Sequence, residues 1–246
     1  LIQATKAADA TYDATTSAAA TFTFTKATQS ITLLTVVADA TYGASPGSVS
    51  ATSNSGLTVA ITSATSAICS LTGTTLTLLA AGTCTVNANQ AGNANYEAAS
   101  QVSQSFTIAK ATQSITFDTP SAMTVGGSTQ TVAPTASSSL TVTLTSTTTG
   151  ICTVAGFVIT AVGSGTCSIT ASQAGNSNYL AAFNVVRTFG ILKATQSISF
   201  TTPSAMTVGG SNQTVTPTAS SSLSVTLTST TTGICTVAGF VITAVA

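Results

Sequence analysis

The sequence predicts an all-β protein built as a tandem array of small β-sandwich domains. Three observations support this prediction. The octapeptide KATQSITF, which begins at Lys110, recurs with small changes at Lys26 and Lys193, at intervals of 84 and 83 residues. Between the copies, apolar residues alternate with threonine and serine, which is the period of two that β-strands show. Turn residues interrupt this alternation about every ten residues and no helical period appears, which is typical of a sandwich.

The repeated octapeptide marks the boundaries of the predicted domains. Each copy follows a short apolar alternating run, so one unit passes into the next with almost nothing between them. This period is too long for a solenoid repeat and suits a small domain. Residues 110–162 and 193–245 differ at only five of 53 positions. We expect the C-terminal strands of a preceding repeat in 1–25, complete repeats in 26–109 and 110–192, and the N-terminal part of a further repeat in 193–246.

Seven strands are expected in each complete repeat, and the second repeat shows them best. Pro134 cannot donate a ladder hydrogen bond, so the second strand should be an edge or contain a bulge there. Pro120 and the Gly126-Gly127 pair mark a bent connection between the first two strands. The expected strands are residues 113–117, 129–136, 140–146, 151–154, 157–162 and 166–172, and a last strand that carries Phe189 and Ile191.

Charge is almost absent from the chain. Five basic and five acidic residues cancel and make up 4% of the sequence. No basic patch exists to bind nucleic acid or an anionic membrane, and no run of 18 apolar residues predicts a membrane-spanning segment. Serine and threonine together exceed a third of the residues. They predict a neutral, hydrogen-bonding exterior that tolerates close neighbours.

Disorder and amyloid-like stacking are alternatives for a chain of this composition. Hydrophobic residues make up 43% of the chain and alternate regularly, which argues against disorder. Paired cysteines and frequent turn residues favour discrete globular units over stacked strands.

The five cysteines follow the repeat. Cys69 and Cys84 are 15 residues apart, as are Cys152 and Cys167, and the chain contains no histidine that could help them hold a metal. We expect disulfides Cys69–Cys84 and Cys152–Cys167, each contributing roughly 3 kcal/mol in the chain-entropy model, and an oxidising compartment. Pairs of small buried thiols are the alternative. Cys235 lies 83 residues after Cys152 without a partner, and is expected to be unpaired or bonded to another molecule.

Catalytic chemistry is not expected. Without histidine the usual hydrolase triads are excluded, and the second repeat holds one acid, Asp118, where paired carboxylates would need two. Asp9 and Asp13 suggest calcium, but the matching positions in later repeats do not keep the charges. We therefore expect no catalytic residues, no cofactor-binding residues and no metal site, and the chain is not expected to be an enzyme.

Two further motifs have simple interpretations. Asn212 begins a formal N-glycosylation acceptor, but its counterpart Thr129 is not asparagine, which favours a chance match. Tyr96 and Tyr179 follow Asn/Gly-rich loops, where a tyrosine more often buries its ring at a domain end than stacks on a ligand. Glycans on the serine- and threonine-rich surface stay an open question.

Several motifs together resemble the bacterial immunoglobulin-like (Big-type) tandem repeats of large cell-surface and extracellular proteins. They are the KATQSITF opening, SSSLTVTL at 137–144, the cysteine pair within 152–170, and AGNSNY at 174–179. The resemblance implies an Ig-like fold and a stalk, spacer or adhesive role outside the cell, and it implies no catalytic residues. The cysteines lie on the fourth and sixth expected strands rather than on the pair of strands joined in antibody domains.

The expected function is that of a structural segment of an extracellular filament or surface fibre, which gives length, stiffness and self-association. The alternative is the stalk of a bacterial adhesin whose binding tip lies elsewhere. An accessory module of a carbohydrate-active enzyme is a third class, but no strand shows the exposed aromatic platform that sugar binding needs. The expected partners are copies of the chain itself, head to tail and also laterally, at the cell surface or outside the cell.

The beginning and end of the sequence complement one another. Residues 193–246 supply the first five strands of a sandwich, and residues 1–25 supply the end of the sixth strand and the seventh. We expect either the continuation of one long repetitive polypeptide, which is the simpler interpretation, or the head of another copy to complete the sandwich begun at Lys193.

Overall fold

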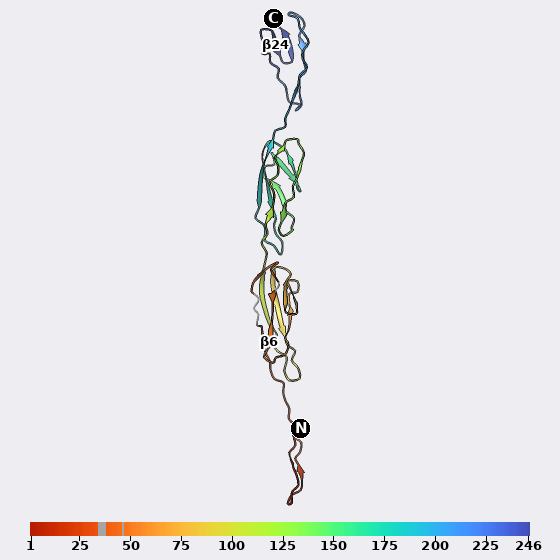
Figure 1. Cartoon of the computed structure of the whole chain (residues 1–246), viewed down its shortest axis with the longest axis vertical. Helices are drawn as coiled ribbons and strands as arrows, with labels where there is room; N and C mark the ends of the chain where they lie inside the picture. The colour runs from red at the N-terminus through yellow and green to blue at the C-terminus, as the bar shows by residue number, and fades with distance from the viewer. Residues whose placement is uncertain (34–37, 46) are drawn as a thin grey trace. The chain divides into compact units, whose positions relative to one another are not determined.

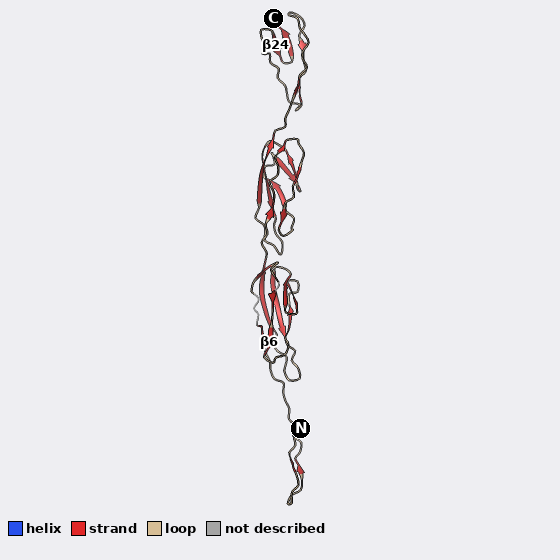
Figure 2. Cartoon of the chain, viewed as in Figure 1, coloured by secondary structure: helices blue, strands red, loops and turns tan. Residues whose placement is uncertain are grey.

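The computed structural model describes residues 1–33, 38–45 and 47–246. These residues form β-strands, turns and loops without any α-helix, as Figure 2 shows, which confirms the all-β prediction. They make two compact units. One contains residues 1–116, 135–142 and 172–184, and the other contains residues 117–134, 143–171 and 185–246. Among the described residues no helix is long and apolar enough to cross a membrane.

The first compact unit contains the first complete repeat and the strand pair that precedes it. The order of strands in its sheets is β1-β2, β3-β6, β5-β9-β8, β4-β11-β10-β7 and β12-β15. Figure 1 labels β6 of this unit and colours the chain by residue number. The strands are β1 (Thr5–Lys6), β2 (Thr15–Thr16), β3 (Ile31–Leu33), β4 (Ala40–Thr41), β5 (Gly47–Ser48), β6 (Ala51–Ser53), β7 (Ala60–Ser63), β8 (Cys69–Thr72), β9 (Thr75–Leu78), β10 (Gly82–Asn89), β11 (Val102–Ala109), β12 (Ile115–Thr116) and β15 (Thr135–Ala136).

The pairing of these strands is that of an Ig-like sandwich. One sheet has the order β4-β11-β10-β7, in which β4 runs parallel to β11 and the other pairs are antiparallel. The other strands pair as β3-β6 and β5-β9-β8. If β5 and β6 are taken as two halves of one strand, the two layers are A-B-E-D and A′-G-F-C, the Ig-like arrangement.

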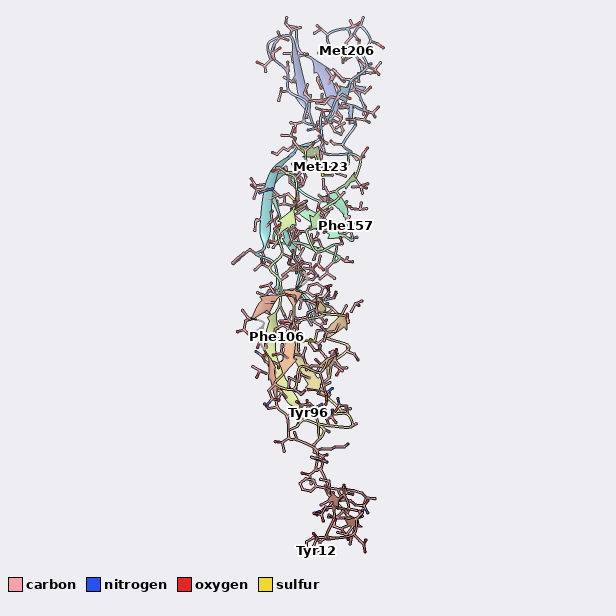
Figure 3. The ribbon with its side chains drawn as sticks, turned by 60° about the horizontal axis from the view of Figure 1, so that its bottom comes forward. Tyr12, Tyr96, Phe106, Met123, Phe157 and Met206 are labelled. Carbon is pink, nitrogen blue, oxygen red and sulfur yellow. A yellow bond between two sulfur atoms is a disulfide. The ribbon has the colours of Figure 1, made fainter. Side chains whose placement is uncertain are left out.

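The core of the first repeat lies between these layers. On β10 every second residue from Cys84 to Ala88 is buried, and on β11 Phe106, which Figure 3 labels, and Ile108 are buried in the same alternation. They pack against buried residues of the facing layer, and each large side chain that is fully buried contributes about 1.5–3 kcal/mol. The strict alternation with threonine, serine and asparagine puts polar side chains on the outer faces. The buried core residues are Val49, Cys69, Leu76, Cys84, Val86, Phe106 and Ile108.

The second compact unit also consists of short β-sheets. The order of strands in these sheets is β13-β20-β19-β16, β14-β18-β17, β21-β23 and β22-β25-β24. The strands are β13 (Met123–Thr124), β14 (Gln130–Thr131), β16 (Thr143–Ser146), β17 (Cys152–Ala155), β18 (Val158–Ala161), β19 (Gly165–Ser172), β20 (Val185–Leu192), β21 (Ile198–Ser199), β22 (Gln213–Thr214), β23 (Thr218–Ala219), β24 (Cys235–Ala238) and β25 (Val241–Ala244).

Two details of the second repeat differ from the expected strands. The connection between the first two expected strands was expected to be a bent loop, but it contains strand β13. This strand pairs in parallel with β20 through Met123 and Ile191. The strand expected over 129–136 is broken into β14 and β15, which pair with different neighbours. Pro134 lies between them and cannot donate a hydrogen bond, so the ladder cannot run through it.

Candidate functional site

Residues 26–109 and 110–192 each contain one disulfide bond. Cys69 of β8 is bonded to Cys84 of β10, with Cα atoms 5.7 Å apart, and all of their surface is buried. Cys152 of β17 and Cys167 of β19 form the matching bond, with a Cα separation of 5.6 Å. In each case the two cysteines belong to different sheets, so the bond joins the two layers of strands.

Cys235 occupies the same place in the last segment and has no disulfide partner. Its Sγ atom lies 3.4 Å from the Oγ atom of Ser229, as the Sγ atom of Cys152 lies 3.3 Å from the Oγ atom of Ser146. The surroundings of the thiol are thus repeated, but Cys235 is only half-buried, whereas Cys152 is fully buried.

The repeated octapeptide is held by the Asn/Gly-rich loop of its own repeat. The N–H of Ala27 donates to the carbonyl of Asn95, and the N–H of Glu97 donates back to the carbonyl of Ala27, both at 2.9 Å. In the second repeat Ala111 makes the same two bonds at 2.9 Å, from its N–H to the carbonyl of Asn178 and from the N–H of Leu180 to its carbonyl. We call these two backbone hydrogen bonds, together with the side-chain hydrogen bonds of the octapeptide glutamine (Gln29 or Gln113), the junction lock.

The glutamine of the octapeptide is buried and forms the side-chain hydrogen bonds of the junction lock. The side chain of Gln113 is 8% exposed. Its Nε2 donates to the Oε1 of Gln173 at 2.6 Å and to the carbonyl of Leu180 at 2.7 Å, and its Oε1 accepts from Ser138. Each polar side-chain atom of Gln113 has a hydrogen-bond partner, so its burial does not carry the free-energy cost of an unsatisfied polar group.

The first repeat builds the same network. The Nε2 of Gln29 donates to Gln90 Oε1 at 2.7 Å and to the carbonyl of Glu97 at 2.6 Å, while its Oε1 accepts from Ser53 at 2.8 Å. The glutamine recurs in all three copies of the octapeptide, but its burial is not predicted from that recurrence. Its appearance in all three copies at the same place was the available signal.

In the Asn/Gly-rich loop of each repeat, one side-chain oxygen accepts hydrogen bonds from two backbone N–H groups and so fixes the turn. Asn176 Oδ1 accepts from the N–H groups of Asn178 and Tyr179, at 2.8 and 2.9 Å, and Asn93 does the same in the first repeat. Asp9 replaces asparagine in residues 1–25 and accepts from Thr11 and Tyr12, both at 2.9 Å. Short polar side chains stabilise turns in this way.

Asp9 also binds a cation from its own chain. Lys6 Nζ lies 2.7 Å from Asp9 Oδ2. Lys6 first, and then the two backbone N–H donors, hold the pKa of the Asp9 carboxyl below its ordinary value. The carboxylate considered for calcium is thus already paired with an ammonium group, and the described residues contain no cluster of three potential metal ligands.

The junction between the two complete repeats contains almost no free chain. Strand β11 ends at Ala109, and Ala111 already belongs to the next junction lock. Lys110 between them donates from Nζ to the carbonyl of Asn176 at 2.8 Å.

The loop of the second repeat also contacts residues of the first within the same compact unit. Asn178 Oδ1 accepts from the N–H of Ala81 at 3.0 Å. Tyr179, which is half-buried, packs edge-on against Tyr42 with ring centroids 5.5 Å apart, in the geometry that aromatic pairs prefer. The loop of the second repeat therefore contacts the first repeat through Asn178 and Tyr179.

We predict that Gln113→Ala weakens the junction lock. The change removes two donated bonds and leaves the side chain of Gln173 and the carbonyl of Leu180 without them, which should cost about 2 kcal/mol. Hydrogen exchange at the amide of Leu180 should then be about thirtyfold faster. Gln196→Ala is the matched control, because Gln196 stands in the third copy of the octapeptide but is exposed. Equal effects of the two variants would show that the buried network does not hold the loop.

The comparisons with known proteins give structural likenesses only. No family model and no curated protein matches the chain. Domains 1–6 of the surface layer protein SbsC are 15% identical with a TM-score of 0.30, over 70% of this chain and 29% of that one. Domains EC1–4 of Drosophila N-cadherin are 11% identical with a TM-score of 0.29, over 88% of this chain and 66% of that one. The 282-residue C-terminal fragment of intimin is 16% identical with a TM-score of 0.23, over 58% of this chain and 53% of that one.

The chain therefore spans less than a third of the length of the surface-layer fragment that it matches. At these identities and TM-scores the likenesses carry no inference about function. The Ig-like fold follows instead from the strand pairings described above.

Proposed function

We propose that this chain is a structural repeat segment of an extracellular filament or surface fibre, of the bacterial immunoglobulin-like kind. In this proposal residues 26–109 and 110–192 are complete domains, residues 1–25 end one domain and residues 193–246 begin another. The proteins that form the outermost layers and fibres of cells need length and repeated surface rather than a reactive site.

The observation that carries the proposal is the junction lock. It ties the first residues of each complete repeat to a loop of that repeat. Before the second repeat, Lys110 is the single residue between the end of β11 and the locked Ala111. A junction without a flexible Gly/Ser linker favours a stiff connection. The inter-sheet disulfides support the location outside the cell, because such bonds persist in oxidising compartments.

The neutral surface supports the proposed self-association. With charged residues at 4% of the sequence, copies of the chain meet little electrostatic repulsion. Threonine and serine on the outer strand faces offer hydrogen bonds to a neighbour without a large desolvation cost.

Location is tested with antibodies raised against the polypeptide of residues 1–246 and applied to intact cells of the source. We expect labelling of the outer surface, removed by external protease, and negative-stain images of the isolated native material that show regularly repeated globules. Laterally packed copies would support a filament, and separate arrays would support the adhesin stalk. Labelling that appears only after the cells are permeabilised would contradict both.

A further inference from the structure

The loop of residues 174–180 belongs to the second repeat but contacts both complete repeats. In its own repeat its backbone forms the two hydrogen bonds with Ala111 that are part of the junction lock. Its other partners are Ala81, through a hydrogen bond, and Tyr42, through a ring contact, and both belong to the first repeat. The loop and all three partners lie within the first compact unit. A change in one repeat can therefore reach the other through this loop.

Tyr42 connects this loop with the core of the first repeat. Its half-buried side chain packs against the buried core residues of that repeat, and its ring meets the ring of Tyr179 edge-on. Its backbone N–H donates to the carbonyl of Ala109 at 2.9 Å, so Tyr42 is also fixed at the end of β11. A side chain that its own repeat already holds in place loses little conformational entropy when a second ring packs on it.

Asn178 forms the polar part of the contact. Its Oδ1 accepts from the N–H of Ala81, the residue directly before β10. Asn178 is half-buried, whereas its counterpart in the first repeat, Asn95, is exposed. A partly buried backbone N–H that loses its acceptor carries a free-energy cost. This bond therefore favours the loop conformation in which Asn178 faces the first repeat.

The aromatic ring at position 42 is not required by the fold. Val125 stands in the second repeat where Tyr42 stands in the first, directly after the short strand that pairs in parallel with the last strand of the repeat. The N–H of Val125 donates to the carbonyl of Leu192 at 3.0 Å, as the N–H of Tyr42 donates to Ala109. Valine thus builds the same backbone arrangement, and the ring of Tyr42 is a feature of this junction.

We propose that the loop of residues 174–180 couples the stability of the two complete repeats through its contacts with Tyr42 and Ala81. The first repeat holds the loop in the conformation that closes the junction lock of the second repeat. Because coupling free energies are reciprocal, the closed loop also stabilises the end of the first repeat. This inference rests on the proposed function and deepens it, since the stability of a tandem array includes an interface term between neighbouring repeats.

The test is native-state hydrogen exchange of the polypeptide 1–246, in which each variant is read in the repeat that it does not change. Tyr42→Val changes the first repeat, and exchange at the amide of Leu180 in the second repeat should become about fivefold faster, because the ring contact is lost. Asn178→Ala changes the second repeat, and exchange at the amide of Tyr42 in the first repeat should become about threefold faster, because the loop no longer bonds to Ala81.

Three controls separate the contact from a general loss of stability. Tyr42→Phe keeps the ring, so exchange at Leu180 should stay within about twofold of that in the unchanged protein. Asn95→Ala removes the exposed counterpart of Asn178 and should leave exchange at the amide of Tyr42 unchanged. The amide of Val86, in a strand that is paired on both sides, reports whether Tyr42→Val has loosened the first repeat itself.

The inference is overturned if Tyr42→Val leaves exchange at Leu180 unchanged, or if Tyr42→Phe accelerates it equally. It is also overturned if Tyr42→Val accelerates Val86 as much as Leu180 while Asn178→Ala has no effect at Tyr42, because the loop would then transmit nothing. Any of these results leaves the proposed extracellular function standing. Labelling only of permeabilised cells in the antibody experiment would contradict that function and would not change the exchange rates, so the two failures are distinguishable.

Discussion

The double variant Cys152→Ala with Cys167→Ala is expected to lose about 3 kcal/mol of the stability of the second repeat. The bond closes a 15-residue separation, and in the chain-entropy model it restricts the unfolded chain by that amount. It also joins β17 to β19 across the two sheets, so its loss removes the only covalent tie between these described strands. Hydrogen exchange at the β19 and β20 amides should become about a hundredfold faster.

Cys235→Ala is the control for the disulfide variant. Cys235 stands at the same place in a nearly identical sequence but carries no disulfide, so its replacement should change exchange by less than about threefold. Mass spectrometry of unreduced peptides should find Cys69 joined to Cys84 and Cys152 joined to Cys167. Free thiols at these four positions, or exchange in the double variant equal to that of the unchanged protein, would contradict the expectation.

Gly175→Ala should destabilise the second junction lock by about 3 kcal/mol. Gly175 has a φ of +77°, in the region where a Cβ atom is strained. A Cβ built there would lie 2.4 Å from the carbonyl oxygen of Tyr179 and 2.7 Å from the carbonyl carbon of Leu180. Both are backbone atoms of the loop that Gln113 holds, so relief requires the loop to leave its hydrogen bonds.

Gly190→Ala is the matched control for this loop. It lies on β20 of the same repeat, and a Cβ there meets no atom within 4 Å. We expect it to leave the melting temperature within about 2 °C of the unchanged protein, while Gly175→Ala lowers it and speeds exchange at the amides of Asn178 and Leu180. If Gly175→Ala were as stable as Gly190→Ala, the loop would have to adopt another conformation at no cost.

Much of the architecture was predictable from local pattern. Alternation of apolar residues with threonine and serine predicted strands, because successive side chains in a strand point to opposite faces. The recurrence of KATQS located the repeats, and the common spacing of the cysteines predicted which of them pair. These features depend on residues close in sequence or on a repeat that can be read directly.

The glutamine of the junction lock was not predictable in the same way. Gln113 looks like a surface residue of a polar motif, yet it is buried because Gln173 and Leu180, some 60 residues later, supply partners for its amide. A polar side chain can be buried only where its hydrogen bonds are satisfied. Sequence alone does not show which distant groups reach it.

By itself the sequence determined the all-β class, the repeat and the positions of the cysteines, since propensity, alternation and spacing are properties of the chain. Only the tertiary structure decided which of these segments are strands. The residues TLTS pair with β19 at 143–146 and form β16, while the same four residues at 226–229 form none. A strand is stabilised by hydrogen bonds to a neighbouring strand, and within the described residues only the TLTS copy at 143–146 has such a partner, β19.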